Sequence, residues 1–284
     1  MKYKLKRVAS AVLMGAMLSA NAYAIEDIQV NGLIEASLSQ VESNDAQGAI
    51  DTVEIGFLAK INNTFDAELV LLDESLGTDA HTGVGIDRAV INANLGAGVL
   101  SLGKMTVPFT MGDSFMISDP VTLEEPVGVG AQFSGSLNNL AYSIYTTTPD
   151  NDYTQTGDNQ FGDLYGVSLD YVPADNALFH ASWVSVDGET SFSAGVEAGI
   201  SQFVIMSQYT NMAGEVEPRL SSEMAYDFGF MTAAAGIQRG GDAKRYRLFG
   251  LSQQFSDNFE GKFEYLDNVD DSETTYTMQV AYSF

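Results

Sequence analysis

Residues 274–284 read TTYTMQVAYSF, and every second side chain in this stretch is apolar or aromatic. The positions between them are small or polar. Successive side chains of a β-strand point to opposite faces, so this alternation predicts a strand with one apolar and one polar face. The apolar face consists of Tyr276, Met278, Val280, Tyr282 and Phe284.

The same two-residue period recurs along most of the chain. It predicts strands over 28–38, 52–61, 65–72, 165–171, 192–200, 220–228, 231–237 and 259–265. The alternation is weaker over 86–95, 99–104, 202–209 and 245–255, where the spacing of the turns places strands instead. The chain is therefore predicted to be all-β.

The polar faces of these strands carry charge, whereas the apolar faces are nearly free of it. A soluble β-sandwich also alternates, but it buries its apolar face in a core. Here the pattern indicates a transmembrane antiparallel up-and-down β-barrel with a wet interior and an apolar exterior. Closure is required because an open edge would leave backbone groups unpaired in lipid. The charged residues of the polar faces are Glu35, Glu54, Lys60, Asp66, Glu68, Arg219, Glu223, Lys262 and Glu264.

Short and long connections alternate along the chain, as in outer-membrane barrels with short periplasmic turns and longer external loops. Short turns are predicted at 62–63, 96–98, 138–139, 173–176, 199–201, 229 and 256–258, and longer loops near 42–51, 73–84, 105–129, 147–160, 187–190, 211–217, 240–244 and 267–273. These connections join about 16 strands, and counts of 14 or 18 stay open. Aromatic residues beside the short turns predict an interfacial girdle: Phe65, Tyr171, Phe179, Phe203, Phe228, Phe230, Phe255 and Phe259.

Residues 1–24 have the pattern of a cleaved secretory signal peptide. Four basic residues precede an apolar run from 8 to 20, and Ala22-Tyr23-Ala24 then supplies the cleavage motif. The alternative is a buried N-terminal helix. We predict export of residues 25–284 as the barrel domain.

Composition excludes several classes of function. Residues 25–284 contain nine basic and 38 acidic side chains, a net charge of −29. So acidic a chain is not expected to bind nucleic acid, and without cysteine it forms no disulfide or thiolate metal site. The 45% hydrophobic and 11% aromatic content argues against disorder. No cofactor is predicted.

The terminal stretch 274–284 also resembles the final-strand signature by which outer-membrane barrels are recognised and inserted. That resemblance implies the bacterial outer membrane as the location. It also implies the barrel-assembly machinery as a partner, with outer-membrane lipid and lipopolysaccharide as surroundings.

The longest connection, residues 105–129, is unusually apolar for an exposed loop. By strand count it is the third external loop, and long ordered loops in compact domains are usually functional. We predict that it folds into the barrel interior and constricts the pore. The alternative is that it packs over the rim or into a neighbouring subunit.

Within this loop the sequence resembles the LbtU-type siderophore porins. The resemblance rests on Gly103-Lys104-Met105, Val107-Pro108-Phe109, Gly112, Met116-Ile117-Ser118-Asp119-Pro120 and Thr122-Leu123-Glu124. The stretch from Pro108 to Asp113 also resembles the constriction segment of general porins. The LbtU resemblance implies passage of a ferric siderophore without a TonB-dependent plug, and the pattern departs from the family at Glu125.

The charges near this loop predict a transverse field across the pore. Acidic residues of the loop would face basic residues of the wall, and neutralising Asp113 and Asp119 is predicted to lower cation selectivity. The acids are Asp113, Asp119, Glu124 and Glu125, and the bases are Arg88, Lys104, Arg219, Arg245, Arg247 and Lys262.

The substrate class stays open between ferric siderophores and small hydrophilic solutes, for which the pore would prefer cations. No plug domain precedes the first predicted strand, so transport is expected to be passive. A non-conducting structural or adhesin barrel is a further alternative. An enzyme would need a histidine at the barrel mouth, and only His81 and His180 are available. A homotrimer is an expectation from porin architecture.

Overall fold

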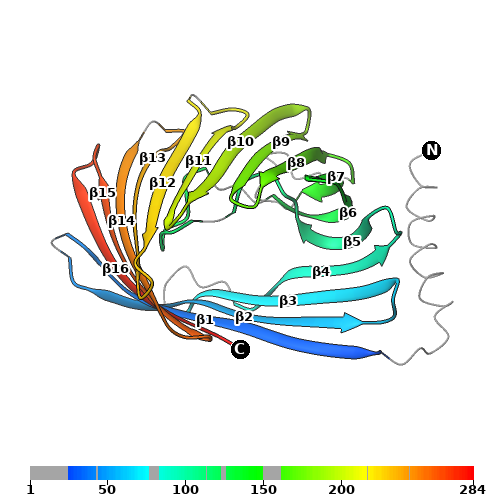
Figure 1. Cartoon of the computed structure of the whole chain (residues 1–284), viewed down its shortest axis with the longest axis horizontal. Helices are drawn as coiled ribbons and strands as arrows, with labels where there is room; N and C mark the ends of the chain where they lie inside the picture. The colour runs from blue at the N-terminus through cyan, green and yellow to red at the C-terminus, as the bar shows by residue number, and fades with distance from the viewer. Residues whose placement is uncertain are drawn as a thin grey trace.

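The computed structural model describes residues 25–284 except 43, 77–82, 113, 123–125, 150–160, 216 and 243. The described residues form one closed antiparallel barrel in which each strand pairs with its neighbours in sequence and β1 pairs with β16 (Figure 1). The 16 strands are β1 (Asp27–Val41), β2 (Gln47–Lys60), β3 (Phe65–Leu76), β4 (Gly85–Asn94), β5 (Val99–Thr106), β6 (Val127–Leu137), β7 (Leu140–Pro149), β8 (Leu164–Ala174), β9 (Ala177–Val186), β10 (Glu189–Ile200), β11 (Phe203–Asn211), β12 (Arg219–Asp227), β13 (Thr232–Arg239), β14 (Arg245–Ser256), β15 (Phe259–Asn268) and β16 (Glu273–Ser283). The predicted all-β barrel and its strand count are confirmed.

The barrel closes where the two ends of the described chain meet. Paired residues run from Leu33 opposite Ser283 to Val41 opposite Thr275. Beyond this ladder, the backbones of Gly32 and Phe284 exchange two hydrogen bonds of 3.0 and 3.1 Å. No edge strand is left unpaired in the described sheet, as a barrel in an apolar medium requires.

Turns occur near the positions that the sequence predicts, but three of the longer loops are shorter than predicted. β2 already begins at Gln47 and β3 extends to Leu76, within the predicted loops 42–51 and 73–84. The seven short connections lie at one end, and positive φ angles at Asn138 and Ser201 tighten two of them. The predicted longer loop near 187–190 is instead a two-residue turn at Asp187 and Gly188, both with positive φ. Asp-Gly favours this tight hairpin turn, which explains the shorter connection.

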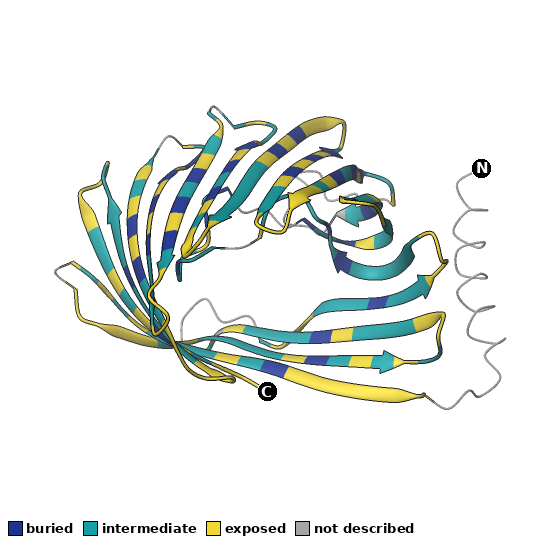
Figure 2. Cartoon of the chain, in the orientation of Figure 1, coloured by how far each residue is buried: buried dark blue, intermediate teal, exposed yellow. Residues whose placement is uncertain are grey.

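The strands place apolar side chains outside and polar side chains inside. In β9, for example, Phe179 and Trp183 are exposed, whereas His180 and Ser182 between them are buried. Figure 2 shows this alternation as dark and light stripes along β9 to β14. The terminal residues Tyr276, Met278, Val280, Tyr282 and Phe284 are all exposed on the outer face.

Aromatic side chains gather on the outer face beside the short turns. All eight residues predicted to form a girdle are exposed, and several pack in pairs. Ring centroids lie 4.5 Å apart for Phe203 and Tyr226, and 4.6 Å apart for Tyr226 and Phe228. Such rings suit a level where an apolar medium meets water.

The predicted signal peptide, residues 1–24, lies outside the described residues. Within the part of the chain that is described, no helix is long and apolar enough to cross a membrane.

Candidate functional site

The connection between β5 and β6 folds back into the barrel interior instead of extending from the rim (Figure 1). We name residues 107–126 the inner loop. A backbone hydrogen bond of 2.9 Å from Val107 to Pro126 closes its base. The loop then runs along the inner wall from β9 to β15, as predicted for the third external loop.

The first part of the inner loop is held by apolar packing. Val107 is 1% exposed and Phe109 is fully buried. They pack against inward side chains of the wall, so this region of the barrel interior is a small hydrophobic core. Its other members are Val90, Met105, Tyr145, Leu164 and Val184.

Polar side chains of β9 hold the backbone at the same point. The carbonyl of Phe109 accepts hydrogen bonds from His180 Nε2, at 3.1 Å, and from Ser182 Oγ. The other ring nitrogen of His180 lies 2.7 Å from Asp170 Oδ1. Both ring nitrogens of His180 thus face an oxygen atom. His180 therefore joins the wall to the loop.

Two buried carboxylates hold the middle of the loop. Glu223 accepts hydrogen bonds from Phe115 N and Ser114 Oγ, each at 3.0 Å. Glu264, only 1% exposed, accepts from Ile117 N at 2.8 Å, from Ser118 N at 3.0 Å and from Ser118 Oγ. Loop amide and hydroxyl donors thus satisfy carboxylates that would be costly to bury alone.

Further wall side chains bond the loop on either side of these carboxylates. Gln208 accepts from Met111 N at 3.1 Å. Gln238 accepts from Val121 N at 3.1 Å, and the hydroxyls of Thr122 and Ser221 lie 2.8 Å apart. Contacts on β9, β11, β12, β13 and β15 therefore fix the path of the loop.

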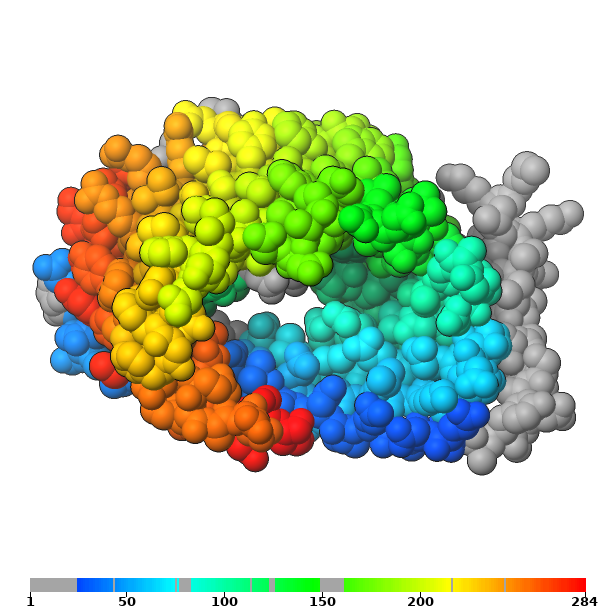
Figure 3. Space-filling view, in the orientation of Figure 1, coloured from blue at the N-terminus to red at the C-terminus, as the bar shows by residue number. Residues whose placement is uncertain are grey.

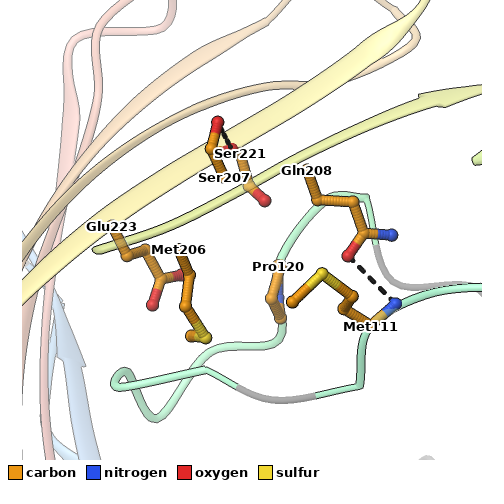
Figure 4. A pocket seen from close by; sticks show the side chains of 7 residues that line it. All are labelled: Met111, Pro120, Met206, Ser207, Gln208, Ser221 and Glu223. Carbon is orange, nitrogen blue, oxygen red and sulfur yellow. Dashed lines mark hydrogen bonds between the residues drawn. The ribbon is translucent and has the colours of Figure 1, made fainter. Parts of the chain in front are cut away.

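Little space remains between the loop and this wall. Figure 4 shows Met111 and Pro120 of the loop facing Met206, Gln208 and Glu223 of β11 and β12. The cavity between them has a volume of about 10 Å³, roughly that of one water molecule. The loop is thus packed onto the wall and occupies one side of the interior.

The opposite side of the interior stays open. Figure 3 shows an opening through the barrel bordered by the blue and cyan strands at the start of the chain. We name the inner face of β1 to β4 the open wall. Few of its residues are buried, in contrast to β9 to β13 (Figure 2). By register, the acidic residues that face inward there are Glu35, Asp51, Glu54, Asp66, Glu68 and Glu74.

Three of the predicted basic pore residues do face the interior, and each pairs with a carboxylate. Arg88 lies 3.2 Å from Glu68, and Lys262 lies 3.6 Å from Glu260. Arg219 pairs with Glu215 and also donates to the carbonyl of Val121 in the inner loop. These pairs offset the basic charge, so the carboxylates dominate the interior.

The other three predicted basic residues lie on the outer face, and for them the prediction is wrong. Lys104 is opposite Val129, which is 58% exposed, and its ammonium donates to the carbonyl of Ile86. Arg247 is opposite Ile237, which is 59% exposed, and Arg245 lies two positions before it. The strand period of two explains the error, because Leu248 and Gly250 face inward and Arg245 and Arg247 therefore face outward.

Of the four acidic residues predicted for the loop side of the pore, the structure describes one. Asp113, Glu124 and Glu125 lie outside the described residues. Asp119 is exposed on the inner loop. The transverse field across the pore therefore stays a prediction.

The residues that carry the family resemblance mostly determine the path of the loop. Val107, Phe109, Met116 and Pro120 are buried, and Ser118 bonds to Glu264. Pro108 is half-buried beside them, and Gly103 lies in β5 with a φ of 141°. Most of these side chains face the wall, so they dock the loop.

Several wall residues that hold the inner loop were not predicted to do so from the sequence: His180, Gln208, Glu223, Gln238 and Glu264. They share one feature of the sequence: each is a large polar or acidic residue in the middle part of a strand. Such a residue needs a buried partner. Among the described residues, no group of three His, Asp or Glu could hold a metal ion.

No family model matches the chain, and no curated protein is similar to it in sequence. Solved structures match its fold. A variant of the Rhodopseudomonas blastica porin is 14% identical with a TM-score of 0.68, covering 91% of this chain and 100% of that one. A loop-deletion mutant of OmpT, an outer membrane protein of Vibrio cholerae, is 12% identical with a TM-score of 0.68, covering 91% and 99%. The chain therefore has the fold of these bacterial proteins.

Proposed function

We propose that the protein is an outer-membrane porin through which small hydrophilic solutes diffuse passively, with a preference for cations. One observation carries the proposal. The inner loop is docked on the β9 to β15 side, which leaves a passage beside the acidic open wall.

The outer face supports a membrane location. A charged side chain facing lipid costs about 2–4 kcal/mol at mid-bilayer in such barrels. Middle parts of the strands expose aliphatic and aromatic side chains there, including Ile144, Trp183 and Phe249. The apolar exterior, the closed sheet and the fold shared with porins agree with insertion in the bacterial outer membrane.

The charge of the open wall supports the cation preference. Strands β1 to β4 contain nine acidic residues and two basic ones, Lys60 and Arg88. A pore lined by one sign of charge concentrates counter-ions. Screening leaves this effect intact within about 8 Å at physiological ionic strength.

Planar-bilayer recordings test the proposal. In a KCl gradient, the protein should give stepwise channels with a cation-selective reversal potential. Glu35→Gln combined with Glu54→Gln removes two inward carboxylates of the open wall and should lower the cation-to-anion permeability ratio about twofold or more. Asp73→Asn, on the outer face of β3 opposite Val53, is the control and should leave the ratio unchanged.

Absence of channels would favour the non-conducting structural barrel. An unchanged reversal potential in the Glu35 and Glu54 variant would contradict the role of the open wall.

The narrower proposal is passage of ferric siderophores, and its support is the resemblance of the inner loop to LbtU-type porins. The buried motif residues dock the loop, so they would set the pore size without contacting a solute. An acidic open wall also repels anionic ferric complexes, which favours the general cation-preferring function.

Uptake into a deletion strain separates the two functions. Ferric-siderophore uptake should fall together with uptake of sugars and amino acids if the pore is general. Selective loss of the ferric complexes would support the siderophore function.

A further inference from the structure

Basic residues are concentrated on the outer face at the loop end of the barrel. Arg239 and Arg245 lie opposite each other on β13 and β14, and Arg247 lies opposite Ile237. Arg239 also shares the outer face with Leu220, which is exposed. Of nine basic residues in 25–284, three lie in this one patch, so their placement in so acidic a chain requires an explanation.

A groove runs across the outer wall between these arginines. It has a volume of about 280 Å³. Aliphatic side chains and guanidinium groups form most of its lining, and Gln238 and Tyr246 complete it. We name it the outer groove, lined by Leu220, Ile237, Arg239, Arg245, Arg247 and Val269.

The arginines differ in how well they are paired. Arg239 pairs with Glu217, and Arg245 lies 2.7 Å from Asp270. Arg247 is 69% exposed and forms a longer ion pair, 3.6 Å from Asp267. Of the three arginines, Arg247 therefore has the most exposed and most loosely held guanidinium group.

The position of Arg247 indicates what occupies the groove. Its strand continues to Phe249, an exposed residue of the outer face, and its cross-strand neighbour Ile237 is 59% exposed. An outward arginine beside lipid-facing residues must lie at the interface and meet a headgroup. Guanidinium groups bind phosphate through paired hydrogen bonds, and aliphatic side chains suit an acyl chain.

We infer that the outer groove binds a phosphorylated glycolipid of the outer leaflet, with its phosphate on Arg247, next to the Arg245–Asp270 pair. Ile237 and Leu220 contact its acyl chains. The inference rests on the proposed outer-membrane location but not on conduction. It gives the chain a specific lipid contact at the mouth of the pore.

Native mass spectrometry of the purified protein in detergent tests the inference, with diphosphoryl lipid A as the probe. The protein should retain this lipid, and Arg245→Gln combined with Arg247→Gln should reduce the bound fraction about tenfold, because charge-assisted hydrogen bonds are lost. The matched control is Arg88→Gln combined with Lys262→Gln, which removes two inward charges and should keep lipid binding.

Three results would overturn the inference. The first is equal binding by the Arg245 and Arg247 variant. The second is equal binding of dephosphorylated lipid A or of inorganic phosphate to the wild type. The third is loss of lipid in EDTA, which would assign it to metal held by the carboxylates. Bilayer conductance of the same variant should match the wild type, so failure of lipid binding and failure of conduction are distinguishable.

Discussion

Glu264 is the residue on which the inner loop and the wall depend most directly. Its carboxylate is 1% exposed and accepts three hydrogen bonds from Ile117 and Ser118 of the loop. Without the loop, an interior carboxylate would face water in the pore. Without the carboxylate, two loop amides would lose their acceptor at a buried site.

Replacing Glu264 by alanine is therefore expected to loosen the inner loop. The loss of its hydrogen bonds should cost about 1–3 kcal/mol of docking free energy. A loosened loop should give larger and noisier single-channel conductance in planar bilayers. Glu260→Ala is the matched control, since Glu260 lies on the same face of β15 and pairs with Lys262. Identical conductance in wild type and Glu264→Ala would contradict the anchoring role.

Gly103 holds a backbone conformation that other residues rarely adopt. Its φ is 141°, and a Cβ there would lie 2.0 Å from the carbonyl oxygen of Ala89. Because that atom belongs to the backbone of β4, the strand itself would have to move. We expect Gly103→Ala to destabilise the barrel by about 1–3 kcal/mol.

The change can be measured as a lower temperature for loss of the compact band on semi-native gels. Gly85→Ala in β4 is the control, because a Cβ there meets only one atom, at 3.9 Å. Equal melting temperatures for the two variants would contradict the assigned strain.

Four strands with weak alternation in the sequence carry buried apolar side chains on their inner face. In β4, β5, β11 and β14 the inward face carries Val90, Met105, Met206 and Leu248, all buried. Both faces of these strands are thus partly apolar, and the two-residue period is blurred. The two-residue alternation could locate these strands, but it could not show that the inner loop packs against their inner face.

The candidate site, like the strands, could be predicted only in part from the sequence. Loop length and apolar content indicate a loop that folds inward, and strand alternation places Glu264 and Glu223 inside. In β14 the inward positions Leu248 and Gly250 are apolar, because Met116 of the inner loop lies against them. Both faces of the strand therefore contain apolar residues, and alternation did not show that Arg245 and Arg247 face outward.

Two ion pairs, Arg245–Asp270 and Lys244–Asp271, join the two loops beside the outer groove at the rim of the barrel, and we name them the clasp. Asp270 accepts from Arg245 N at 2.7 Å, and Asp271 lies 2.9 Å from Lys244 Nζ. The hydrogen bond from the Arg245 side chain lowers the pKa of Asp270, and the bond from Lys244 lowers the pKa of Asp271. The clasp thus connects the loop before β14 with the one after β15.

The sign of the pH dependence follows from these lowered pKa values. The clasp contributes fully above the ordinary aspartate pKa of about 3.9 and is lost as the pH falls through the lower folded values. Carboxyl-carbon NMR should therefore show both aspartates titrating below about 3.9. In Lys244→Gln the titration of Asp271 should move upward, while Asp270 keeps its partner Arg245. Titration of Asp271 at an ordinary value in the wild type would contradict the clasp.

At the scale of the whole molecule, the outer face of the barrel is not uniform. Strands β1 to β5 contain only two aromatic residues, Phe57 and Phe65. Their outer face is mostly aliphatic or small, with Ile28, Leu69 and Ala89 among its members. The remaining strands carry the aromatic residues that anchor a wall at a lipid–water interface. An apolar wall without such anchors is typical of a surface covered by protein.

We therefore expect the protein to self-associate through the outer face of β1 to β5. Trp is tolerated on a lipid-facing wall but blocks close packing between subunits. Ala67→Trp and Ala89→Trp, which face outward on β3 and β4, should reduce the mass of the detergent-solubilised particle measured by light scattering. The wild type should have the mass of a trimer. Ala181→Trp, the same substitution on the outer face of β9, should leave that mass unchanged. A monomeric wild type, or equal masses for all three variants, would contradict the interface.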